Sequence, residues 1–350
     1  MAGRSTLAWL TLVGCLFGSL SAHSAEVLTL AASGEGIEVV RARGVEAGIA
    51  PVPAAVGVLT ADGQYRRVVR VNGSLALGAP TSLSTPDPVR PEAILPDGEI
   101  TRGTADITRA WLSEPTERYR HGVLGDAVEA GALVLERADG RRFEYVLDAG
   151  SVFEDRRVRL IDLDQDGRDE AIVVQSYLDE GAALAVFAMG RDGVMFISEV
   201  PAIGRANRWL NPVGAGDFDG DGVVEIAYVE TPHIGGALRL FEYRDRRLHE
   251  DHAARGFSNH AIGSRVQDQS AIHDWTGDGV PDMAVPDARR RGLRFVTFAR
   301  GTFHEFDQVS HDQAIVTAIY PAILDDSGQV FAVYGLADGT LVAVRPGNGN

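Results

Sequence analysis

A short acidic motif occurs three times in this chain and restricts the possible folds more than any other feature of the sequence. The copies read DLDQDGRDE at 162–170, DFDGDGVVE at 217–225 and DWTGDGVPD at 274–282. Oxygen-bearing side chains at the first, third, fifth and ninth positions, with glycine at the sixth, can direct several oxygens into one small volume. A hard cation such as calcium requires a donor set of this kind. The motif therefore predicts three calcium loops.

Each loop is expected to supply four side chains and one backbone carbonyl to its ion. The expected ligands are Asp162, Asp164, Asp166, Glu170 and the Arg168 carbonyl in the first loop, Asp217, Asp219, Asp221, Glu225 and the Val223 carbonyl in the second, and Asp274, Thr276, Asp278, Asp282 and the Val280 carbonyl in the third. Thr276 offers an oxygen without a charge, so the third site is expected to be the weakest. The alternative is an acidic Asp-Gly turn that binds no metal, but three copies in register favour calcium.

The copies recur at a nearly constant step, with 55 residues between the starts of the first two and 57 between the next two. A step of this length can hold a four-stranded antiparallel sheet with its turns, which is typical of a propeller repeat. Short β-type runs follow the loops. The twelfth position holds Val173, Tyr228 or Val285 in place of the bidentate Glu of an EF-hand, which excludes that class.

These loops and the strands expected after them resemble the FG-GAP/VCBS repeat family, whose propeller relatives include the head of integrin α-chains. The resemblance covers about 158–290. It implies an all-β, calcium-stiffened β-propeller used for adhesion or recognition, and it implies no activity.

Residues 26–350 are expected to form a single β-propeller domain of about six four-stranded antiparallel blades, with seven as the alternative. Calcium loops would join the first and second strands of three blades, at about 158–213, 214–270 and 271–321. Two strands from each end of the chain would share the closing blade and remove exposed sheet edges. Prolines at 78–98 predict a long loop, because repeated prolines remove the donors that a central strand needs.

The first 25 residues have the pattern of a secretory signal peptide: Arg4, an apolar stretch at 7–20, and small residues up to Ala25. The mature protein would begin near Glu26 and be secreted or periplasmic. Cys15, the only cysteine, lies in this segment, so the mature chain would contain no disulfide and metal would stiffen it. The alternative is an outer-surface lipoprotein with a lipid anchor on Cys15. No later stretch predicts a transmembrane span.

Binding to a protein or glycan is expected at one face of the propeller. The net charge of −16 makes nucleic acid a poor partner, because phosphate binding relies on clustered Lys and Arg. Antiparallel connectivity places the loops between second and third strands, and those between blades, opposite the metal loops. The candidate residues there are Tyr177, Arg205, Asn207, Arg208, Trp209, His233, Asn259, His260 and Asp287. Arg and aromatic residues anchor many interfaces; alternatively, Trp209 and His260 fill gaps between blades.

The sequence favours a recognition, adhesion or scaffold module with about three calcium ions over an enzyme. It contains no Gly-x-Ser-x-Gly elbow and no HExxH motif, and its mature part has no thiol. The segment HEDH at 249–252 contains possible zinc ligands, but it follows several arginines and is interpreted as solvated surface. A secreted hydrolase or lyase with its active site at the propeller mouth is the alternative.

Overall fold

The computed structural model describes residues 24–31, 38–41, 53, 55–59, 64–81 and 90–347. Over these residues the chain is all β apart from one 3-10 turn, η1 (Ala299–Gly301), and no helix there is long and apolar enough to cross a membrane. The predicted signal peptide as far as residue 23, Cys15 included, lies outside the described residues, as do residues 82–89 of the predicted proline-rich loop. The all-β prediction is confirmed.

The described strands form four four-stranded antiparallel sheets and one nine-stranded sheet, in which most strands adjacent in sequence are paired. We divide the nine-stranded sheet at β10 into sheets 2 and 3, and number the resulting six sheets in chain order, with the sheet that contains both chain ends as sheet 6. Sheets 1 and 2 contain β2 (Glu38–Arg41), β3 (Val56–Leu59), β4 (Tyr65–Val71), β5 (Ser74–Thr81), β6 (Thr101–Arg102), β7 (Ile107–Thr116), β8 (Glu129–Arg137) and β9 (Arg142–Val146). Sheet 3 contains β11 (Arg159–Ile161), β12 (Glu170–Tyr177), β13 (Gly181–Met189) and β14 (Val194–Glu199). β10 (Ser151–Phe153) pairs with both β8 and β12 and so joins sheets 2 and 3.

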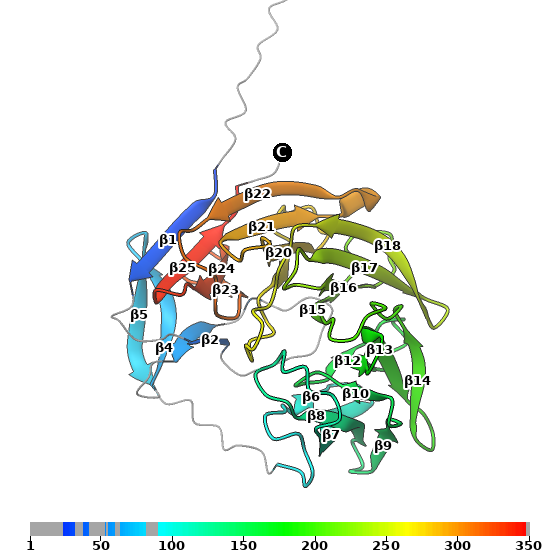
Figure 1. Cartoon of the computed structure of the whole chain (residues 1–350). Coiled ribbons are helices and arrows are strands. Elements are labelled where there is room, and N and C mark those ends of the chain that lie inside the picture. The colour runs from blue at the N-terminus through cyan, green and yellow to red at the C-terminus, as the bar shows by residue number, and fades with distance from the viewer. Residues whose placement is uncertain are drawn as a thin grey trace, which may run out of the picture.

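The later sheets repeat the same four-strand order. Sheets 4 and 5 contain β15 (Leu210–Gly216), β16 (Glu225–Glu230), β17 (Ala237–Arg244), β18 (Arg247–Arg255), β19 (Ala271–His273), β20 (Asp282–Pro286), β21 (Gly292–Thr297) and β22 (His304–Ser310). Sheet 6 contains β23 (Tyr320–Ile323), β24 (Val330–Gly335), β25 (Thr340–Arg345) and β1 (Glu26–Ala31). In Figure 1 the sheets follow one another around a common centre, with β5, β14, β18, β22 and β1 at the periphery.

The two ends of the chain meet in sheet 6, where β1 pairs with β25 and Glu26 lies opposite Arg345. The sheet therefore combines one N-terminal strand with three C-terminal strands. The expected division of two and two is wrong, because β2 pairs with β3 in sheet 1 and not with β1. Closing the sheet with β1 covers an edge of β25 that would otherwise present unpaired backbone groups.

Successive side chains of the central strands enter different apolar cores. In β16, Ile226 and Tyr228 pack toward sheet 3, whereas Ala227 and Val229 pack toward sheet 5. Successive side chains of a strand point to opposite faces, and here both faces are covered. This explains why the strand after the second acidic loop reads as an unbroken apolar run.

Apolar clusters of this kind join each sheet to the next from sheet 2 through sheets 3, 4, 5 and 6, and then sheet 6 to sheet 1. In the described part of the chain, no such cluster joins sheet 1 to sheet 2. The sheets therefore pack face to face in chain order, and the loops at their ends are brought into two groups.

Candidate metal centres

The three acidic loops join the first strand to the second in sheets 3, 4 and 5, connecting β11 to β12, β15 to β16 and β19 to β20. Successive loops contact one another. Gln165 Nε2 of the first loop donates to the Gly222 carbonyl of the second at 3.1 Å, and a Cβ built on Gly220 would lie 3.1 Å from Val280 of the third. The loops therefore lie side by side at one end of the sheets.

The first aspartate of each loop holds the loop backbone in a tight turn. Asp217 accepts the N–H of Gly222 at 3.0 Å. The equivalent bonds of the other loops link Asp162 to Gly167 and Asp274 to Gly279. Gly222 has a φ of 91°, which residues with a side chain rarely adopt, so the turn requires glycine at the sixth position.

The seventh residue of each loop is held by the fifth, since its N–H donates to the fifth-position carboxylate. These bonds run from Arg168 to Asp166 at 2.9 Å, from Val223 to Asp221 at 2.8 Å and from Val280 to Asp278 at 2.9 Å. The Arg168 side chain leaves the loop and donates to the Met189 carbonyl at 2.6 Å. The three loops thus share one backbone arrangement despite different sequences at these positions.

The ninth residue of the second loop, Glu225, is fully buried and connects the loop to the following strand. Its Oε2 accepts the N–H of Phe218 at 2.6 Å, while its Oε1 is buried without a hydrogen-bond partner. Glu170 makes the equivalent bond to Leu163 at 2.9 Å in the first loop. A buried carboxylate oxygen without a partner is costly. A bound cation would satisfy it, so these residues fit a metal ion.

The carboxylates converge to different degrees in the three loops. In the second loop, one oxygen from each of four residues lies within 4.8 Å of the others: Asp217, Asp219, Asp221 and Glu225. In the first loop, Asp162, Asp164 and Glu170 form such a group without Asp166. The acids of the third loop, Asp274, Asp278 and Asp282, do not form one. The donor set therefore fits a hard divalent cation best in the second loop and least well in the third.

Burial raises the pKa of the ninth-position acids. The pKa of Glu225 is raised to about 8 and that of Glu170 to about 7, first by loss of solvation and then by the neighbouring carboxylates of the same loop. Their backbone hydrogen bonds act in the opposite direction. The pKa of Asp282 is raised to about 6, again mainly by burial. A cation would favour the ionised form of each acid.

At the opposite end of the sheets, three of the residues expected to contact a partner form one aromatic cluster. Trp209 stacks on His233, with ring centroids 6.1 Å apart, and lies 4.7 Å from the ring of His260. His233 Nε2 lies 2.9 Å from His260 Nδ1. Burial lowers the pKa of His233 to about 4 and that of His260 to about 3, so both rings are neutral at pH 7.

The predicted partner-face residues fall into a buried group and an exposed or half-buried group. Trp209 and His260 are fully buried, as is Asn259, whose side chain donates to the Asn211 carbonyl at 3.1 Å. The burial of Trp209 and His260 agrees with the gap-filling interpretation given for these two residues, and the buried Asn259 is likewise not presented to a partner. The exposed or half-buried residues are Tyr177, Arg205, Asn207, Arg208, His233 and Asp287.

Two acids that follow β10 were not predicted as functional residues. Glu154 and Asp155 are fully buried there. His121 Nδ1 lies 2.7 Å from Glu154 Oε1. Glu129, also buried, is close by, and burial together with the Glu154 charge raises its pKa to about 9. The acids lie in a break between β10 and β11, which no motif marks in the sequence.

The segment 249–252 differs from its interpretation as solvated surface. His249 and Glu250 are exposed, but the side chains of Asp251 and His252 are only 24% and 21% exposed. Together with Asp219 of the second loop they form a third group of possible metal ligands, whose donor atoms lie within 4.8 Å of one another. Asp219 lies 32 residues before Asp251 in the sequence, so spacing alone could not reveal the group.

The fold and these loops define an all-β repeat protein with acidic, potentially metal-binding turns. Residues 162–228, from the start of the first loop through most of β16, match the model of the FG-GAP-like repeat. The chain therefore contains an FG-GAP-like repeat, and the resemblance inferred from the sequence is confirmed. No curated protein matches the chain.

Proposed function

We propose that the chain is a six-bladed, calcium-binding β-propeller that serves as a recognition, adhesion or scaffold module. The convergence of four carboxylates in the second loop, with the buried Glu225 Oε1 left without a partner, carries this proposal. Calcium bound there would neutralise the carboxylates and fix the turn between β15 and β16. The first and third loops share the backbone arrangement and would take an ion with lower affinity.

A propeller is supported by the order of the sheets. Each sheet has four strands, consecutive in sequence except that β1 completes sheet 6, and apolar clusters join sheets 2 to 6 in order and sheet 6 to sheet 1. Figure 1 shows the fourth strands at the periphery and β2, β15 and β23 nearer the centre. We assign sheets 1 to 6 as the blades, and residues 82–89 as part of the connection between the first two.

A location outside the cytoplasm is part of the proposal, either secreted or periplasmic. It is supported by the signal-like segment before Glu26. Calcium loops of even modest affinity would be filled there, since extracellular modules work at Kd values of roughly 10⁻⁴–10⁻³ M. The proposed partner is a protein or glycan that binds the face opposite the metal loops. Arg205 and Asn207, which are exposed, are the first residues to test there.

The decisive experiment is thermal unfolding in millimolar calcium and in chelator, with calorimetric titration of calcium into the stripped protein. Binding to the folded state alone stabilises it by about 2.7 kcal/mol at a hundredfold excess over Kd, so a clear rise in Tm with calcium is expected. Unchanged Tm together with no heat of binding would remove the metal from the proposal. Glycan and protein screens on the calcium-loaded form would then identify the partner class.

A secreted hydrolase or lyase is the second candidate function. The observation that favours it is the contact of the half-buried His121 with the buried Glu154 at 2.7 Å, with Glu129 nearby, because paired acids with a raised pKa can exchange protons with a substrate. Hydrolysis assays on glycans and esters with wild-type protein and with Glu154→Gln would test it. Turnover that the substitution abolishes would favour an enzyme over a binding module.

A further inference from the structure

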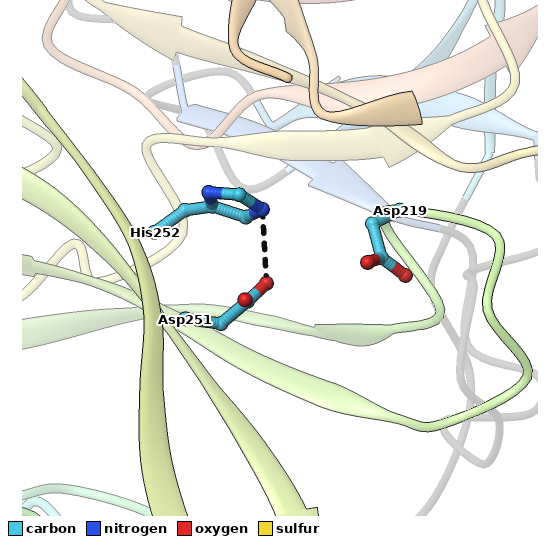
Figure 2. Close-up of side chains that lie close together, drawn as sticks. All are labelled: Asp219, Asp251 and His252. Atoms are coloured by element: carbon cyan, nitrogen blue, oxygen red, sulfur yellow. Dashed lines mark ion pairs between the residues drawn. The ribbon is translucent and has the colours of Figure 1, made fainter. Parts of the chain in front are cut away.

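The outer strand of sheet 4 contains a bulge at Asp251. In the register of β17 with β18, Leu240 lies opposite His252 and Phe241 opposite Glu250, so Asp251 has no residue opposite it. Successive side chains of a regular strand point to opposite faces, whereas a bulge re-aims a side chain. As a result Asp251 and His252 face the same way, and Asp251 Oδ2 lies 3.0 Å from His252 Nε2 (Figure 2).

Asp219 supplies a third donor from a different part of the sheet. It is the third residue of the second acidic loop, and its Oδ1 accepts the N–H of Asp221 at 3.0 Å. One oxygen of Asp219, one of Asp251 and one ring nitrogen of His252 lie within 4.8 Å of one another. Figure 2 shows the Asp219 side chain across from the Asp251 carboxylate and the His252 ring.

The imidazole of His252 is held in place by the next sheet. Its ring stacks on that of Phe298, a fully buried residue just after β21, with ring centroids 5.2 Å apart and planes at 30°. The backbone N–H of Arg300 in η1 donates to the Asp219 carbonyl at 2.8 Å. The His252 ring and the Asp219 backbone are therefore both held in place by contacts with residues that follow β21 of sheet 5.

The contact between Asp251 and His252 lacks the geometry of a hydrogen bond. Asp251 Oδ2 and His252 Nε2 are both withdrawn from solvent, yet neither has a hydrogen-bond partner. Two donor atoms on one zinc-like ion, each about 2.0–2.1 Å from the metal, lie about 3.3 Å apart at a tetrahedral angle. The observed 3.0 Å is close to that separation, and an ion between the atoms would satisfy both.

We propose that Asp219, Asp251 and His252 form a second kind of metal site, which takes a divalent transition ion such as zinc. An imidazole nitrogen with two carboxylates suits zinc and its neighbours, whereas calcium prefers oxygen donors. Three protein donors leave a fourth position on the ion open to water or a ligand. Asp219 is shared with the second calcium loop, so the two ions would be bridged by one carboxylate.

The corresponding bulges of sheets 3 and 5 do not provide the same donors. Ile197 and Phe306 are the corresponding extra residues of β14 and β22, each without an opposite residue in its register, and both are apolar. The residues after them are Ser198 and Asp307. Sheets 3 and 5 thus have a β-bulge in the outer strand but no histidine beside it. Among these three sheets, the proposed second metal site is therefore confined to sheet 4.

The test uses the full mature chain, freed of any histidine tag and saturated with calcium. Co²⁺ is added as a spectroscopic probe and Zn²⁺ by calorimetry, and the same titrations are repeated on His252→Ala, Asp251→Asn and the matched control His249→Ala, which changes an exposed histidine on the same strand. One Co²⁺ or Zn²⁺ per chain is expected in wild type and in His249→Ala, with at least tenfold weaker binding in the other two variants.

Calcium binding by each variant is measured in parallel, so that misfolding is recognised. If His252→Ala binds calcium normally and still binds Zn²⁺ as tightly as wild type, the proposal is wrong, and it is equally wrong if wild type shows no Co²⁺ absorption bands. Glu225→Gln separates the two metals. It should weaken calcium binding and leave the Zn²⁺ stoichiometry at one, so failure of the calcium proposal can be told apart from failure of this one.

Discussion

Glu225 accepts the backbone N–H of Phe218 across the second acidic loop at 2.6 Å, and the Phe218 ring is fully buried between sheets 4 and 5. One carboxylate thereby connects the turn that gathers the acids to the apolar seam beside it. Metal binding at the loop and packing between the sheets are therefore coupled, and a substitution at Glu225 should affect both.

Glu225→Gln should weaken calcium binding at the second loop by about tenfold or more, the range seen when residues supporting a metal site are changed. The amide oxygen can still accept the Phe218 N–H, so the main loss is the negative charge. Calorimetric titration measures the affinity. Glu117→Gln, at an exposed position just after β7, is the matched control and should bind calcium as wild type does. Equal affinity in both variants would contradict the assignment of Glu225.

Calcium should stabilise the protein more at pH 8 than at pH 5. The pKa values of Glu225 and Glu170 are raised in the folded state from 4.5 to about 8 and about 7. The folded chain without metal therefore binds more protons than the unfolded chain, and its stability falls as the pH rises from about 4.5 to about 8. Calcium binds the ionised acids and offsets this loss.

The measurement for this pH dependence is the difference in Tm between calcium and chelator at several pH values. The difference should grow across the window from pH 5 to pH 8. A difference that stays constant, or that shrinks with rising pH, would show that the ninth-position acids do not bind the ion.

Thr276→Asp should strengthen calcium binding at the third loop, because it places a charged oxygen at the third position. Calcium titration of wild type is expected to show a last, weakest site that becomes stronger in this variant. Thr276→Asn supplies an oxygen without a charge and serves as the control, with no gain expected. A gain of equal size in both variants would point to a change in loop conformation and not to the added charge.

Trp209→Ala should destabilise the fold by about 3–5 kcal/mol, as expected when a fully buried large side chain is removed. Arg205→Ala, at an exposed position nearby, should change stability by no more than about 0.5 kcal/mol. Chemical denaturation in saturating calcium measures both. A small effect of Trp209→Ala would mean that the ring is not a structural plug and would return it to the candidate partner face.

The sequence allowed the metal-loop part of the fold to be predicted, because each loop combines local requirements that can be read directly. Gly222 is required by its positive φ, and the acids around it precede an apolar run that is buried on both faces. These signals locate the loops between the first and second strands of sheets 3, 4 and 5. Such predictions succeed where a structural feature is determined by a few neighbouring residues.

Features that depend on distant pairing could not be predicted in the same way. Strands β1 and β2 are both strand-like and close in sequence, and only pairing of β1 with β25 shows that they belong to different sheets. The same holds for Asp251 and His252, whose common orientation depends on a bulge set by the register with β17. The burial of Trp209 depends likewise on packing between sheets.

The pairing of β1 with β25 also determines when sheet 6 can form during synthesis of the chain. β1, the first strand of the described residues, pairs only with β25, so sheet 6 cannot be completed until residues 340–345 have been synthesised. A chain cut short before Thr340 would leave β24 with an unpaired edge and β1 without a neighbour. Completion of sheet 6 therefore distinguishes a chain that reaches β25 from one that is truncated before it.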